Sequence, residues 1–282
     1  MLYVARRRVA AEPVSKLAIW SRRLALFAIA VVLLVIVIVN LGFLDPVPAI
    51  ASLAGSLFFA FVAMVLAFGA FVVIWRQGSR GLRLAVAALA IGVAMLAYPA
   101  FLAVRFYRLP AVNDITTDPV DPPRFEAIAR LRPRGANPVA YPGPAAMQLQ
   151  RTAYPDIEPL MVSATPLEAY EAALAVITKR KWRIVDVRAP QTGRREGRIE
   201  AVARTPIMGF RDDIVVRVRA AEDGARVDIR SASRYGLHDF GANASRIRSL
   251  SDDIDDLAGA EKPKPKAPPK PVPKKAAQPA RR

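Results

Sequence analysis

One stretch of the sequence gathers side chains of the types that bind anions or take part in catalysis. It lies between a predicted strand that ends at Ser231 and a predicted helix that begins near Ala244. Such a junction presents backbone N–H groups and the positive end of a helix dipole, which attract an anion. Arginine adds bidentate recognition of carboxylate or phosphate. The candidate ligand-binding residues are Ser231, Ser233, Arg234, His238, Asp239, Asn243 and Arg246.

The same stretch has two other interpretations. Its serine, aspartate and asparagine side chains can simply cap the helix and tie down the loop, with Asn243 as the expected N-cap. Ser233, His238 and Asp239 are also the residue types of a hydrolase triad. Adjacent His238 and Asp239 fit triad geometry poorly, and the sequence has no G-x-S-x-G nucleophile elbow. We therefore predict no catalytic residues.

Metal and cofactor chemistry has few candidate residues. The sequence has no cysteine and one histidine, which excludes thiolate sites and sites built from several histidines. Asp114, Asp118 and Asp121 offer oxygen ligands for calcium, but their spacing is not that of an EF-hand. Asp-Pro pairs are also ordinary turn starters. We expect no metal and no cofactor.

The net charge of +17 is concentrated at the N-terminal flank and in the C-terminal tail. Residues 105–260 contain 24 basic and 21 acidic side chains, so this part of the chain is nearly neutral. Nucleic acid is therefore not an expected partner.

Three apolar segments predict membrane-spanning helices. Each is long enough for a hydrocarbon core of about 30 Å, and none contains an ionisable side chain. The absence of intramembrane charge argues for an anchor in the lipid bilayer and against a transporter. Ala85, Ala88 and Gly92 can let the helices pack closely. The segments are 24–43, 50–74 and 84–104.

Flanking charge predicts how this anchor is inserted. The N-terminal flank and the loop 76–83 together carry nine lysine and arginine side chains, whereas the loop 44–49 has none. The positive-inside rule then places the N-terminus in the cytoplasm and the C-terminal domain in the periplasm of a bacterial inner membrane. A cytoplasmic domain is the alternative. Ala49-Ile50-Ala51 also resembles a signal cleavage site.

Residues 161–260 predict a two-layer α+β sandwich that follows the α-helical anchor. Thr165-Pro166-Leu167-Glu168 forms a capping box that opens an amphipathic helix, and a second amphipathic helix runs from about 244 to 257. Between them lie four antiparallel strands, the first two joined by a turn that holds Gly193 and Gly197. The strands are Trp182–Arg188, Arg198–Arg204, Asp213–Ala220 and Ala225–Ser231.

The predicted sheet has one apolar and one charged face. We interpret the charged face as solvated, with cross-strand ion pairs between its side chains. A partner-binding surface is the alternative. The charged residues include Glu200, Arg217, Asp228 and Arg230.

Two further segments are rich in proline. The stretch 105–160 predicts an irregular segment that packs on the domain through Ile115, Phe125 and Tyr141, with a plain linker as the alternative. The tail 261–282 predicts disorder, and its lysines either solubilise the chain or contact anionic polymers or lipid headgroups. The expected organisation is 1–23 basic N-terminus, 24–104 anchor, 105–160 irregular segment, 161–260 domain and 261–282 tail.

Several short motifs of the sequence are distinctive. They are ITTDPVDPPRF at 115–125, Tyr154-Pro155, Trp182, GRIEA at 197–201, FRDDIVVRV at 210–218 and RSASRYGLHDFGANASRI at 230–247. Together they resemble the bacterial domain of unknown function 1499 family. The resemblance covers roughly residues 112–257, and it implies no particular chemistry, because the family has no established activity. The three-span region is similar to a companion of this domain in one branch of the family.

These observations predict a membrane-anchored periplasmic module that binds a ligand or another protein. An anionic group bound at residues 230–246 and an envelope protein are the expected partners besides the bilayer. An enzyme is less consistent with the residues, although a hydrolase or transferase that acts on an envelope component is the first alternative. A structural subunit of a larger membrane complex is the second.

Overall fold

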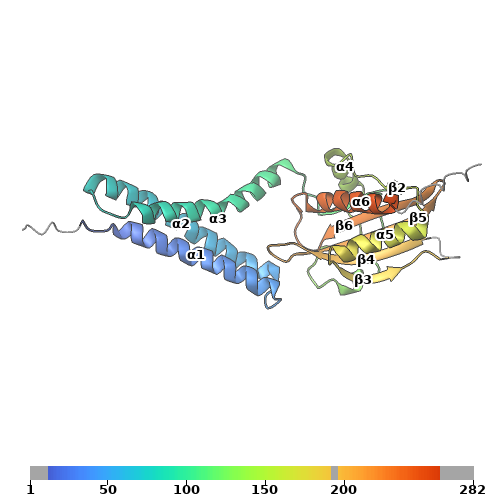
Figure 1. Cartoon of the computed structure of the whole chain (residues 1–282), viewed down its shortest axis with the longest axis horizontal. Coiled ribbons are helices and arrows are strands. Elements are labelled where there is room, and N and C mark those ends of the chain that lie inside the picture. Colours follow the sequence, from blue (N-terminus) through green and yellow to red (C-terminus); the bar gives the residue numbers. More distant parts are fainter. Residues whose placement is uncertain (1–11, 192–195, 261–282) are drawn as a thin grey trace, which may run out of the picture.

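The computed structural model describes residues 12–191 and 196–260. Three long helices form one end of the molecule and an α+β domain forms the other (Figure 1). The predicted turn residue Gly193, the tail 261–282 and residues 1–11 lie outside the described residues.

Three N-terminal helices are long and apolar enough to cross a membrane. α1 and α3 run toward the domain and α2 runs away from it (Figure 1). Pro46 suits the first turn of α2, and Gly78 ends that helix in the left-handed conformation at φ 65°. The helices are α1 (Lys16–Asn40), α2 (Pro46–Gln77) and α3 (Leu82–Arg108).

The three helices pack through a seam of small residues. Gly92 of α3 lies so close to Met64 of α2 that a Cβ atom there would be 2.4 Å from the Met64 Cγ. Ala85 and Ala88 are fully buried, which confirms the close packing predicted for α3. Bulky apolar side chains such as Phe61 point outward, as they do in helices surrounded by lipid.

The domain is built on one antiparallel sheet of six strands in the order β1-β6-β5-β4-β3, with β2 also paired to β6. The prediction of four strands is wrong because β1 and β2 have only three residues each, too few for alternation to show. Both lie along the same edge of β6. The strands are β1 (Asp114–Thr116), β2 (Leu160–Val162), β3 (Arg183–Arg188), β4 (Glu196–Arg204), β5 (Arg211–Ala221) and β6 (Gly224–Ser233). Gly197, predicted in a turn, lies in β4.

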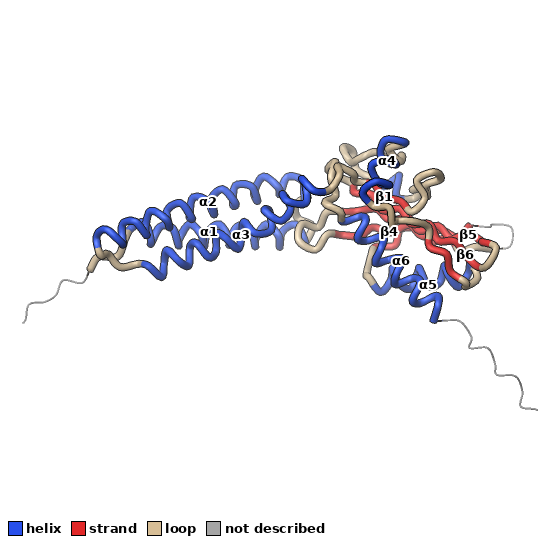
Figure 2. Tube along the Cα trace, turned by 90° about the horizontal axis from the view of Figure 1, so that it is seen from above, coloured by secondary structure: helices blue, strands red, loops and turns tan. Residues whose placement is uncertain are grey.

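Two helices, α5 (Pro166–Lys179) and α6 (Ala242–Ala260), cover one face of the sheet (Figure 2). The predicted capping box is present, since Thr165 Oγ1 accepts from the N–H of Glu168 and the Glu168 carboxylate accepts from the N–H of Thr165. The apolar core lies between these helices and the sheet. Its fully buried members include Ile177, Ile199, Ile214, Ile229 and Leu250.

The opposite face of the sheet is covered by the proline-rich segment, so the expectation of a solvated charged face is wrong. Phe125 and Ile128 pack on Val202 and Val215 of the sheet. The segment contains a short 3₁₀ turn (Ile128–Leu131). It also contains a helix, α4 (Pro144–Ala153), which its proline-rich sequence did not indicate. Proline is tolerated there because Pro144 is in the first turn of the helix.

Four charged side chains predicted on that face are buried and paired, namely Glu200, Arg217, Asp228 and Arg230. Glu200 is fully buried, and its carboxylate accepts hydrogen bonds from the backbone N–H groups of Glu126, Ala127 and Ile128 at 2.8, 3.2 and 2.8 Å. Arg217 donates to the carboxylate of Asp228. A buried charge is costly unless it is hydrogen-bonded. The charged side chains of this sheet face can therefore be buried only where the segment or the sheet supplies their hydrogen-bond partners.

The domain also contacts the ends of the candidate membrane spans. The loop 205–210, which joins β4 to β5, reaches α1, and Asn40 Nδ2 donates to the backbone oxygen of Ile207 at 3.1 Å. Met208 packs against Val35 and Val39 of α1. This contact fixes which end of the sheet lies nearest the candidate membrane spans.

Candidate functional site

The strand-to-helix junction is organised by Asn243, which is fully buried. Its Oδ1 accepts from Ser231 Oγ at 2.8 Å and from Arg246 Nη1 at 2.6 Å. Its Nδ2 donates to Ser233 Oγ and to the backbone oxygen of Asn113, both at 3.0 Å. The structure therefore brings these predicted residues together around one amide.

Asp239 is the residue that caps α6. Its two carboxylate oxygens accept from the N–H groups of Gly241 and Asn243, each at 2.8 Å. The prediction of Asn243 as N-cap is wrong, because α6 begins at Ala242 and the Asn243 side chain makes tertiary bonds instead. Burial raises the pKa of Asp239, although these two hydrogen bonds oppose the rise.

His238 joins the domain to the end of α3. Its Nδ1 accepts from the N–H of Phe240 at 2.8 Å, so its Nε2 carries the proton that bonds the backbone oxygen of Leu109 at 3.1 Å. The ring also packs on Phe106 of α3 and on Phe240. Both ring nitrogens are engaged by the backbone, so His238 does not form a triad with Ser233.

The two arginines of the predicted set lie on different faces of the sheet. Arg246 bonds Asp212 at 2.5 Å beside Asn243. Arg234 lies on the opposite face and donates Nε and Nη2 to Asp213, at 2.9 and 2.7 Å. Burial raises the pKa of Asp212, and the charge of Arg246 opposes that rise. Each arginine thus has a carboxylate partner inside the protein.

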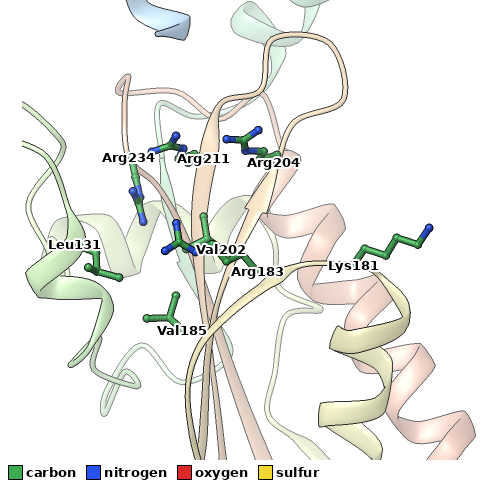
Figure 3. A pocket seen from close by; sticks show the side chains of 8 residues that line it. All are labelled: Leu131, Lys181, Arg183, Val185, Val202, Arg204, Arg211 and Arg234. Carbon is green, nitrogen blue, oxygen red and sulfur yellow. The ribbon is translucent and has the colours of Figure 1, made fainter. Parts of the chain in front are cut away.

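Arg234 instead borders a second polar region, which we call the arginine hollow. It is a recess of about 240 Å³ on the sheet face opposite α5 and α6. Figure 3 shows the guanidinium groups of Arg183, Arg204, Arg211 and Arg234 gathered at one end of the sheet, whereas Lys181 points away from them. Its lining residues are Leu131, Lys181, Arg183, Val185, Val202, Arg204, Arg211 and Arg234.

The hollow carries uncompensated positive charge. Arg183, Arg204 and Arg211 are exposed, and none of them forms an ion pair with another residue that the structure describes. Arg204 and Arg211 are directly opposed across β4 and β5. Like charges at opposed positions of an antiparallel pair are destabilising, so a bound anion would stabilise this arrangement.

The hollow also lies at the end of the sheet nearest the candidate membrane spans. Arg204 is the last residue of β4 and Arg211 is the first of β5, and the loop between them contacts α1. Sequence reasoning missed this site, although one signal was present. Two arginines flank the six-residue loop TPIMGF, which itself contains no acidic side chain.

The three aspartates considered for calcium are bound by arginines instead. Asp114 accepts from Arg230, Asp118 from Arg226 and Asp121 from Arg217. Over residues 12–191 and 196–260, no group of three or more histidine, cysteine, aspartate or glutamate side chains is arranged to hold a metal ion.

Three candidate spans, a six-stranded antiparallel sheet and two helices on one of its faces define an α+β domain attached to a candidate membrane anchor. The sequence of residues 114–254 matches the family described as protein of unknown function (DUF1499), and the chain belongs to that family. No curated protein and no solved structure gives a significant match to the chain. The match begins at the first residue of β1, so the family includes the proline-rich segment.

Proposed function

We propose that the chain is a membrane-anchored binding module of the bacterial inner membrane, and that its domain binds an anionic group, phosphate above all, in the arginine hollow. The observation that carries this proposal is the set of three unpaired guanidinium groups, Arg183, Arg204 and Arg211, around one recess. Guanidinium forms bidentate, charge-assisted hydrogen bonds with phosphate and carboxylate, and it retains its charge at any physiological pH.

The junction at 230–246 is the less suitable of the two candidate sites for an anion. Its N–H groups and its arginine Arg246 are already bonded to Asp239 and Asp212, so an external anion would have to displace a buried carboxylate. The hollow requires no displacement. Arg234, which belongs to both regions, keeps Asp213 as its partner while it lines the recess.

The proposed location is the periplasmic side of the membrane. Three crossings put the N-terminus and the domain on opposite sides, and the basic residues near the N-terminus favour the cytoplasm. A fusion of alkaline phosphatase after residue 260 tests this orientation, with a cytoplasmic fluorescent protein fused at the same position as its counterpart. Phosphatase activity is the expected result, and fluorescence in place of it would reverse the proposed orientation.

Binding is tested with the purified full chain in detergent and with glycerol 3-phosphate as probe, by calorimetry. We expect binding in about the millimolar range, because a small phosphate ester uses only the polar part of the site. The double variant Arg204→Ala/Arg211→Ala should weaken it by about tenfold or more, since a hydrogen bond to a charged group contributes about 1.5–3 kcal/mol.

The matched control is Arg134→Ala/Arg151→Ala, which removes the same charge from two exposed arginines that form no ion pair with any described residue. The control variant should bind glycerol 3-phosphate with the same affinity as the unaltered chain. Equal binding by both double variants would show that only net charge matters, and the hollow would then have no specific role.

A further inference from the structure

A second recess lies beside the arginine hollow, and we call it the apolar cavity. It has a volume of about 440 Å³ and lies between the start of α2 and the domain loops 205–210 and 235–240. This volume is within the range of small-molecule sites, about 300–1,000 Å³. Most of the surface that lines it is apolar, although six of the lining residues are polar or charged. The apolar part is contributed by residues such as Val47, Ile50, Phe210, Tyr235 and Phe240.

The hollow and the apolar cavity share one residue, Arg211. Arg211 begins β5, and the neighbouring pairs Arg204–Thr205 and Ser233–Arg234 contribute one residue to each recess. The cationic recess and the apolar one therefore lie on either side of the same strand ends. A single ligand with a charged head and an apolar chain fits this arrangement.

Val47 and Ile50 belong to the first turns of the candidate span α2, so the apolar cavity opens at the level where a bilayer would end. Large apolar side chains surround this level. Phe43, Tyr107 and Leu237 are 81%, 86% and 79% exposed. Tyrosine, the residue type at position 107, concentrates at the membrane–water interface. A chain that enters the cavity can thus come directly from the membrane.

We infer that the ligand is a membrane lipid with an anionic phosphate headgroup, whose phosphate lies in the arginine hollow and whose acyl chain enters the apolar cavity. This inference rests on the proposed function and specifies its ligand class. The carboxylates of Asp212 and Asp239 also line the cavity, but both are already bonded, to Arg246 and to the α6 N-terminus. Acceptor carboxylates offer phosphate no hydrogen-bond donor, so the headgroup's partners are the arginines of the hollow.

Native mass spectrometry of the full chain in detergent tests the inference. Phosphatidylglycerol is added as the anionic lipid, phosphatidylcholine as the zwitterionic lipid, and glycerol 3-phosphate as the headgroup without chains. We expect phosphatidylglycerol to bind at least about tenfold more tightly than glycerol 3-phosphate, because burying a few methylene groups contributes about 0.8 kcal/mol each. It should also bind more tightly than phosphatidylcholine, because the choline cation is repelled by the arginines of the hollow. Equal affinity for glycerol 3-phosphate would overturn the inference and leave the proposed function intact.

A variant of the apolar cavity and its control distinguish the contribution of the cavity to binding from that of the hollow. Ile50→Trp fills the apolar cavity and should lower phosphatidylglycerol affinity by about tenfold, the loss of two buried methylene groups, while glycerol 3-phosphate still binds. Val65→Trp is its control, because Val65 is a similarly exposed residue of α2 that does not line the cavity. Unchanged lipid affinity in Ile50→Trp would refute the role of the cavity.

Arg204→Ala/Arg211→Ala should lose both the lipid and the soluble phosphate ester. If this double variant retains phosphatidylglycerol at full affinity, the headgroup is not held by the hollow and the proposed ligand is wrong. If the unaltered chain binds neither probe, the proposed function fails together with the inference.

Discussion

Arg230 donates hydrogen bonds from Nε and Nη2 to the two carboxylate oxygens of Asp114, at 2.9 and 2.7 Å, and so joins β6 to β1. The pair is almost fully buried, and its guanidinium also lies over the ring of Phe125, 4.6 Å from the centroid. Burial raises the pKa of Asp114, and the bond to Arg230 opposes the rise. This pair fastens the proline-rich segment to the sheet.

Replacing Asp114 by alanine should lower the free energy of unfolding by about 3–5 kcal/mol, because the buried charge of Arg230 loses its carboxylate and keeps only the backbone oxygens of Pro123 and Val139. Chemical denaturation followed by tryptophan fluorescence measures the loss. Asp156→Ala is the control, since Asp156 and Arg248 form an exposed pair that contributes about 0–1 kcal/mol. The double variant Asp114→Leu/Arg230→Met should be more stable than Asp114→Ala alone. A small loss in Asp114→Ala would show that the pair does not hold the segment.

Gly224 begins β6 at φ 140°, a conformation that other residues rarely adopt. A Cβ atom there would lie 2.2 Å from the backbone oxygen of Val162 in β2. Gly224→Ala should therefore destabilise the domain by at least about 1–3 kcal/mol, the usual cost of such strain, and displace β2. Thermal unfolding measures this loss of stability, and Gly259→Ala is the control. Gly259 is an open position in a helix, where alanine should stabilise by up to about 1 kcal/mol.

His238→Ala should loosen the attachment of the domain to α3. The variant removes the bond to the Leu109 oxygen, the acceptor of the Phe240 N–H and the packing on Phe106. We expect faster hydrogen exchange at the Phe240 amide and faster proteolysis near Leu109, while binding of glycerol 3-phosphate is unaffected. Unchanged exchange at Phe240 would mean that His238 does not hold this loop.

Tyr141 gives a prediction about pH. Burial, together with the nearby charge of Asp114, raises the pKa of its phenol to about 12. The unfolded value is about 10, so the folded chain holds this proton more tightly. The resulting stabilisation is fully present below about pH 10 and is lost as the pH rises through about 12. The ultraviolet titration of the unaltered chain is compared with that of Tyr141→Phe, and their difference should show the Tyr141 phenolate forming near pH 12. A step near 10 would contradict the burial argument.

Sequence reasoning predicted the long, regular elements of this chain. The three apolar helices, the capping box at Thr165 and the four longer strands depend on periodicity that short windows reveal. It could not find β1, β2 or α4, because three residues carry no alternation and the prolines around α4 suggested only loops. These elements are specified by distant partners, such as Gln150, whose amide pairs with the backbone of Thr116.

The candidate site was predicted only in part. Periodicity located the polar junction, because its residues are neighbours in the chain, and the structure brings most of them together around Asn243. Arg183, Arg204 and Arg211 come from three strands, and each looked like an ordinary solvated charge in its own strand. Only the register of β4 on β5 and the path of the covering segment show that they meet.

The pairing of β1 with β6 also imposes an order on folding. Asp114 meets its partner Arg230 only after 115 intervening residues have been made, so the segment that follows α3 waits for the last strand. Contacts of this separation make folding slow. Until β6 is in place, the edge formed by β1 and β2 has no sheet to join, and Glu200 and the arginines of that face remain in water. A chain interrupted before β6 would therefore carry the three candidate spans beside an unfolded domain, whose exposed apolar surface and unpaired strand edges favour aggregation.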